Sequence, residues 1–153
     1  LLVERANGLD GLAGAIGLVV GTAGLIGARA SPVMGVVGDR VGFRRVLTAA
    51  LGGGGIALLL MSATPSVPSL ALVAGLNAGF AAATTAMVFG LLAVEVPAER
   101  RSATLNLVYL PLYLAGIVGP ARGSVVVAAG LPVVFDLAGA VLLAVAVVVL
   151  RRR

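Results

Sequence analysis

The sequence has no cysteine, no histidine and no tryptophan, and every one of its basic residues is arginine. Without cysteine and histidine, the chain lacks disulfides, thiolate or imidazole metal ligands, and the commonest nucleophiles and general bases. Without lysine, it cannot form the phosphate-binding loop of an ATPase. We therefore predict that the chain is not an enzyme, has no catalytic residue, and needs no metal and no cofactor.

Charge is scarce as well: charged residues make up 11% of the chain and hydrophobic residues 60%, and the mean hydropathy is +1.15. No charged side chain occurs between Val46 and Val94, or between Ser102 and Ala121. A helix needs about 20 residues to cross a bilayer, so either stretch is long enough. These properties predict an all-α integral membrane protein.

Five hydrophobic segments, separated by charged or turn-forming residues, predict a bundle of five transmembrane helices. We expect these helices at about residues 11–36, 46–61, 70–94, 103–129 and 133–150. Pro65 and Pro68 fall between the second and third segments, where proline ends or interrupts a helix.

Arginine is distributed unequally between the two sides of these five crossings. One side has only Arg5, next to Glu4 and close to Asp10. The other side has the following arginines: Arg40, Arg44, Arg45, Arg100, Arg101, Arg151, Arg152 and Arg153. Basic loops stay in the cytoplasm, so the pattern predicts a multi-pass protein of the cell membrane with a cytoplasmic carboxyl end. The net charge of +5 is thereby attributed to topology, and we expect no nucleic-acid partner.

Small residues recur at four-residue spacing within the predicted helices. Such pairs allow helix backbones to approach closely in lipid, so we expect their faces to pack on other helices. The pairs are Gly17 and Gly21, Gly75 and Gly79, and Gly119 and Gly123.

Between the first two segments, the sequence reads GVVGDRVGFRR. We expect Gly38 and Gly42 to form a tight turn, and Asp39 to cap or face the amino end of a helix. The arginines can pair with acidic groups or with lipid phosphates. The residues of this candidate gating loop are Gly35, Gly38, Asp39, Arg40, Gly42, Arg44 and Arg45.

This loop resembles the G-x-x-x-D-R-x-G-x-R-R loop of the major facilitator superfamily, which joins the second and third helices of each six-helix half. Ser31-Pro32, residues 96–102 and residues 116–123 resemble the same half-transporter. The resemblance covers nearly the whole chain and aligns it with helices two to six. It implies that residues 1–153 are a partial major facilitator domain, with the first helix of the half missing before Leu1.

Residues 76–80 and 105–113 most resemble the carboxyl-terminal half of bacterial drug-efflux members, and Gly75 stands where an amino-terminal half usually has arginine. The resemblance implies a secondary transporter, most simply a proton-coupled multidrug antiporter that exports small hydrophobic compounds. Its partners would be the lipid bilayer, the small-molecule substrate, protons and the other half of the transporter. The alternative is a noncatalytic membrane subunit, such as the permease component of a pump.

The resemblance also implies a gating role for the loop. Asp39 would latch the two halves by contacting the amino end of the fourth segment, near Ser102 to Leu105. Arg40 would pair with an acidic residue at a neighbouring helix end, and Glu95 is the nearest candidate. Glu95 could equally do no more than end its helix.

Two charged residues lie within the predicted fourth and fifth crossings. Arg122 and Asp136 belong to consecutive antiparallel segments at similar depth, and a charge in hydrocarbon costs roughly 2.5–3.5 kcal/mol. We expect the two to form an ion pair, so that folding lost on charge reversal at one is restored by reversal at the other. Asp136 could instead carry protons.

Polar and aromatic side chains within the segments are candidates for the translocation path. Arg29 could face a cavity or extend its guanidinium toward the cytoplasm. The spacing of Asn106, Tyr109 and Tyr113 places them on one helix face, which helix packing explains equally well. Pro111 and Pro120 are expected to kink that helix. The candidate path residues are Arg29, Asn77, Asn106, Tyr109 and Tyr113.

Overall fold

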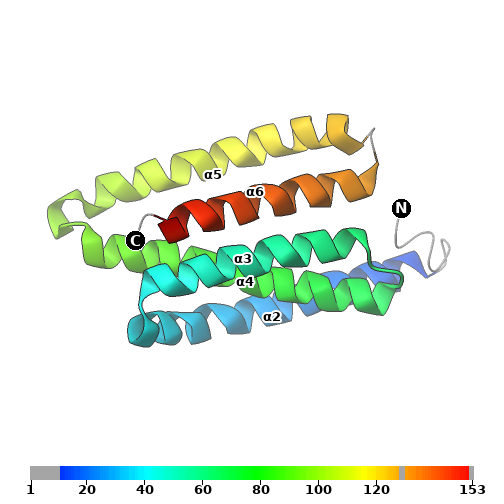
Figure 1. Ribbon diagram of the computed structural model, residues 1–153, viewed down its shortest axis with the longest axis horizontal. Helices are drawn as coiled ribbons and strands as arrows, with labels where there is room; N and C mark the ends of the chain where they lie inside the picture. The colour runs from blue at the N-terminus through cyan, green and yellow to red at the C-terminus, as the bar shows by residue number, and fades with distance from the viewer. Residues whose placement is uncertain (1–10, 128–129, 152–153) are drawn as a thin grey trace.

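The computed structural model is a bundle of long helices that run side by side (Figure 1). It describes residues 11–127 and 130–151, without the side chains of residues 112, 120–122, 124 and 125. The helices are α2 (Leu12–Val41), α3 (Phe43–Ser62), α4 (Val67–Glu95), α5 (Ala98–Val127) and α6 (Leu131–Arg151). Each is long and apolar enough to cross a membrane, α5 by its first 22 residues. The all-α membrane bundle of five helices predicted from the sequence is therefore confirmed.

The predicted loop between the first two helices is much shorter in the structure. Helix α2 continues to Val41, and Gly42 alone separates it from α3. Gly42 has φ 102° and ψ 130°, a conformation that side chains disfavour. The first part of the candidate gating loop, including Asp39, therefore lies in the last turns of α2. The prediction was wrong here because a helix satisfies its own backbone polar groups near lipid, and nothing before Gly42 ends it.

Helix α4 also begins earlier than predicted, at Val67 rather than at residue 70. Ser66 is its N-cap: the Ser66 hydroxyl accepts from the backbone N–H of Ser69 at 3.4 Å, and the Ser69 hydroxyl accepts from the Ser66 N–H at 3.2 Å. Pro68 falls in the first turn, where its missing N–H would have had no helical partner. Proline thus starts this helix instead of delaying it.

Helix α5 begins at Ala98, five residues before the predicted start. The carboxylate of Glu99 in its first turn favours this start, since the amino end of a helix carries partial positive charge. The helix runs through both Pro111 and Pro120 without interruption. The side chain of Pro120 lies outside the described residues, and a bend at either proline stays a prediction.

Helix α4 lies at the centre of the packing. It contacts α2 on one side and α3 on another, α3 also packs against α6, and α5 has few contacts with α6 and α4 (Figure 1). At the α2–α4 contact, a Cβ added to Gly75 would lie 2.5 Å from Ile26 Cδ1, and one added to Gly79 would lie 3.3 Å from Ile26 Cγ2. The prediction that the Gly75 and Gly79 face packs on another helix is therefore confirmed.

The other two glycine pairs behave differently. A Cβ added at any of their four positions would meet no atom within 4 Å among the described residues, so these pairs pack on no helix there. The positions are Gly17, Gly21, Gly119 and Gly123. Glycine does bring backbones close together between α3 and α6, where a Cβ on Gly139 would lie 2.8 Å from the carbonyl oxygen of Gly55.

Candidate functional site

The α2–α3 turn, the α4–α5 turn and the end of α6 meet at one end of the bundle, on the left of Figure 1. We call it the arginine-rich end, because the described parts of these elements include Arg40, Arg44, Arg45, Arg100, Arg101 and Arg151. The α3–α4 turn lies at the opposite end and has no charged residue. The arrangement therefore separates the charges as the sequence pattern predicted. Arg152 and Arg153 lie outside the described residues.

Glu95, the last residue of α4, forms an ion pair with Arg44 in the first turn of α3. Arg44 Nη2 lies 2.9 Å and Nε 3.3 Å from the same carboxylate oxygen, Oε1. The side chains are 59% and 51% exposed. An ion pair so open to solvent contributes roughly 0–1 kcal/mol, so it can break and re-form at low cost.

The expected partner of Glu95 was Arg40, and the structure instead provides Arg44. Because α2 continues to Val41, Arg40 belongs to the last turn of α2. Arg44 is in the first turn of α3, which packs alongside α4 and its terminal Glu95. The sequence alone does not distinguish the two arginines, since the choice depends on the single residue at which α2 ends.

A second arginine contacts the same end of α4. Arg101, in the first turn of α5, donates from Nη2 to the carbonyl oxygen of Ala93 at 2.8 Å and to that of Val96 at 3.4 Å. The last carbonyls of a helix have no helical partner, and their partial negative charge favours a cation. The end of α4 is thus joined to α3 through Arg44 and to α5 through Arg101. No feature of the sequence pattern distinguishes Arg101 from the other arginines of this end.

Two glycines of the candidate gating loop have different roles. Gly42 provides the turn, as predicted. Gly38 is buried inside α2, and a Cβ there would lie 2.8 Å from Met87 Cε and 2.9 Å from Phe43 Cδ1. Gly38 therefore lets α2 pack closely on α4 and on the start of α3, and it forms no turn.

Asp39 is exposed in the last turn of α2. The N-cap position of α3 is Gly42, without a side-chain cap, so Asp39 does not cap that helix. Among the described residues, α2 and α5 do not contact each other. The expected contact of Asp39 with residues 102–105 is therefore absent within this chain.

The candidate path residues do not form one cluster. Tyr109 and Tyr113 of α5 stack with ring centroids 6.1 Å apart, and Tyr109 lies 5.7 Å from the ring of Phe89 on α4. Asn106 shares their helix and is exposed. Asn77 lies 12 residues, or about 18 Å of helix, before Phe89, and its side-chain oxygen is close to Gly54 of α3. The structure therefore separates Asn77 from the three residues of α5.

The remaining candidates have charged side chains. Arg29 is exposed on α2. Asp136 is exposed in the second turn of α6. The side chain of Arg122 lies outside the described residues, so its ion pair with Asp136 stays a prediction.

A bundle of five membrane-length helices with arginines gathered at one end is typical of a multi-pass membrane protein. The family model of the Major Facilitator Superfamily matches residues 6–153. The chain therefore belongs to the Major Facilitator Superfamily, a family of membrane transporters. Neither a curated protein nor a solved structure matches the chain.

Proposed function

We propose that the chain is the carboxyl-terminal half, from its second helix to its sixth, of a proton-coupled exporter of small hydrophobic compounds. The observation that carries the proposal is the motif from Gly35 to Arg45, placed at the turn between two membrane-length helices. Family membership gives the class of transporter. The efflux type and the choice of half are supported by the resemblance of residues 76–80 and 105–113 to drug-efflux members.

The geometry of the arginine-rich end supports a gating role for the motif. Gly42 is the only residue between α2 and α3, and a glycine there can act as a hinge about which the two helices change their angle. The contacts of Arg44 and Arg101 join the end of α4 to both neighbouring helices. These contacts are exposed and weak enough to rearrange as two helical bundles rock against each other. We place this end on the cytoplasmic side of the cell membrane because it carries most of the arginines.

The surface of α5 supports the view that further helices belong to the assembly. Leu107 is 68% exposed, Tyr113 67% and Ile117 73%, and α5 has few contacts with the rest of the bundle. An apolar helix with an aromatic and amide face suits contact with another helix of the transporter or with an amphipathic substrate. We propose that Asn106, Tyr109 and Tyr113 line the translocation path.

The test is transport by the whole protein in proteoliposomes with an imposed proton gradient and a panel of hydrophobic drugs. Asp39→Asn should lower gradient-driven flux on the order of ten-fold, within the range of coupling energies between conformational states. The matched control is Glu99→Gln, which removes an exposed carboxylate from the same end and should leave the flux unchanged.

Each other outcome has a definite meaning. If wild-type protein shows no gradient-dependent flux for any compound, the exporter proposal fails. The better hypothesis is then a uniporter of another solute or a membrane subunit. If both carboxylate variants lose flux equally, the effect is one of surface charge, and the gating role of Asp39 is wrong.

A further inference from the structure

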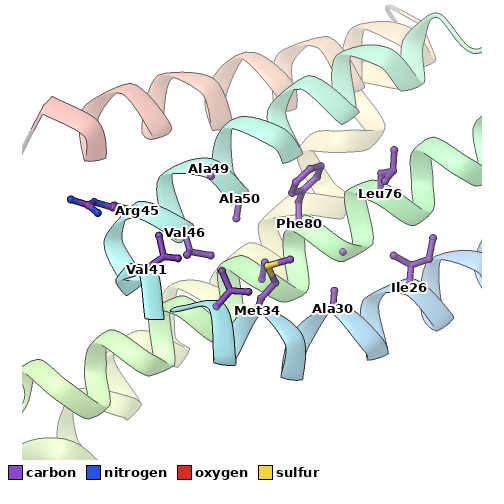
Figure 2. A pocket seen from close by; sticks show the side chains of 13 residues that line it. Ile26, Ala30, Met34, Val41, Arg45, Val46, Ala49, Ala50, Leu76 and Phe80 are labelled. Carbon is purple, nitrogen blue, oxygen red and sulfur yellow. The ribbon is translucent and has the colours of Figure 1, made fainter. Parts of the chain in front are cut away.

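An apolar groove of about 450 Å³ lies between α2 and α3, with α4 as its floor (Figure 2). The two helices meet at Gly42, and both then pack on α4 with little contact between them. Met34 and Val41 on α2 and Ala49 on α3 are among the lining residues. Phe80 of α4 also lines the groove, and Ile26 and Leu76 lie at the end away from Arg45 (Figure 2). The groove is lined by helix faces of this chain that no other part of the described structure fills.

Arg45 is the only charged residue among the described residues that line the groove. It lies on the same face of α3 as Ala49, one turn away, at the arginine-rich end of the groove (Figure 2). The preceding Arg44 is directed to Glu95. The groove thus presents an apolar wall along its length, and Arg45 lines one end while its guanidinium points outward from that end (Figure 2).

The groove is elongated along α2. Ile26 and Val41 both line it, and the 15 residues from one to the other rise about 22 Å along α2. From the arginine-rich end it therefore extends past the middle of a hydrocarbon core that is about 30 Å thick. A site for a compact polar solute would place several donors and acceptors on such a wall. This wall instead matches a flexible hydrocarbon chain that ends in an anionic head group.

We propose that the groove binds an anionic phospholipid of the leaflet at the arginine-rich end, with one acyl chain along α2 and α3 and its phosphate on Arg45. Arginine forms bidentate hydrogen bonds with phosphate oxygens and keeps its charge at every physiological pH. The other arginines of this end add an attraction for anionic head groups. The site is separate from the proposed translocation path, so the lipid is a structural or regulatory ligand.

Residues 1–153 contain no cysteine, so once any cysteine elsewhere in the whole protein is replaced by serine, one fluorescent reporter at a time can be attached. The whole protein carries a bimane label at Val33→Cys, which is exposed on α2 between lining residues. The matched control carries the label at Val141→Cys, which is exposed on α6 at similar depth. Both are placed in bilayers of phosphatidylcholine and phosphatidylglycerol in which one or the other lipid has brominated acyl chains.

Brominated phosphatidylglycerol should quench the Val33 reporter more than brominated phosphatidylcholine does, and the two lipids should quench the Val141 reporter equally. Arg45→Gln should reduce the preference at Val33 about five-fold, the effect of losing one basic side chain near anionic lipid. Arg45→Lys keeps the charge but loses the bidentate contact, so it should reduce the preference less than Arg45→Gln does. Arg100→Gln should also reduce it less than Arg45→Gln, because Arg100 does not line the groove. Ala49→Phe, at an exposed lining position, should lower quenching by both lipids at Val33 only.

Three results would overturn the proposal. Equal quenching by the two lipids at Val33 would mean that the groove has no preference for an anionic head group. Protection of the Val33 reporter from both lipids would mean that another helix of the protein fills the groove. Disulfide cross-linking between Val33→Cys residues of two molecules would mean that a second copy occupies it.

Discussion

At the scale of single residues, glycine sets how closely the helices approach each other. A Cβ on Gly55 would lie 2.8 Å from Leu143 Cγ and 3.0 Å from the carbonyl oxygen of Gly139. The neighbouring Gly52 is in the same helix, and a Cβ there would meet nothing within 4 Å. Of these two glycines, only Gly55 is required for the contact of α3 with α6.

Gly55→Ala should therefore destabilise the bundle by roughly 1–3 kcal/mol, because the added methyl group meets a backbone atom that cannot move aside. Gly52→Ala should be neutral or slightly stabilising, since alanine favours the helix. Thermal unfolding in detergent, followed by far-ultraviolet circular dichroism, measures both. Equal melting temperatures for the two variants would show that this crossing does not limit the packing.

At the scale of helices, the end of α4 is the point where three elements are joined. Arg44 of α3 binds the carboxylate of Glu95, and Arg101 of α5 binds the carbonyls of the last turn. The first contact is an ion pair open to water, and the second uses backbone groups that every helix leaves unpaired at its end. Neither contact adds much stability. Together they hold the start of α3 and the start of α5 next to the end of α4.

A double-mutant cycle with Arg44→Gln and Glu95→Gln should give a coupling free energy of about 0.2–1 kcal/mol for unfolding, as expected for an exposed pair. The coupling should shrink as salt is added, because ions screen surface charges. Chemical unfolding of the single and double variants in detergent provides the measurement. A coupling of several kcal/mol that salt leaves unchanged would mean that the pair is buried in the membrane-embedded protein.

At the scale of the whole molecule, the alternation of turns sorts the charges to one end of the bundle. The α2–α3 and α4–α5 turns share the arginine-rich end with the end of α6, and the α3–α4 turn lies opposite. When such a bundle spans a bilayer, the protein surface on one side of the membrane is strongly basic. That face should be cytoplasmic by the distribution of arginine.

Single cysteines test this sidedness, because the chain has none of its own. Ala63 and Ala98 are both exposed, one at the α3–α4 turn and the other at the start of α5. A membrane-impermeant maleimide added to intact cells should label Ala63→Cys, and label Ala98→Cys only after permeabilisation. The reverse pattern would invert the proposed orientation, and labelling of both from outside would contradict the number of crossings.

The sequence by itself determined the membrane environment, the five helices and the separation of charge. Each follows from composition and from spacing along the sequence. Apolar segments of membrane length form helices because lipid offers no hydrogen bonds to the backbone, and successive crossings place their loops on alternate sides. The motif from Gly35 to Arg45 also indicated the family that residues 6–153 match.

Only the tertiary structure decided which side chains of different helices contact each other. The ion pair of Glu95 with Arg44, the role of Gly38 in packing on Met87, and the contact of Arg101 with α4 all depend on helix rotation and on the residue where each helix ends. A change of one residue rotates a helix face by about 100°. Apolar segments that are nearly uniform around their circumference do not specify that rotation, so the packing of the five helices specifies it.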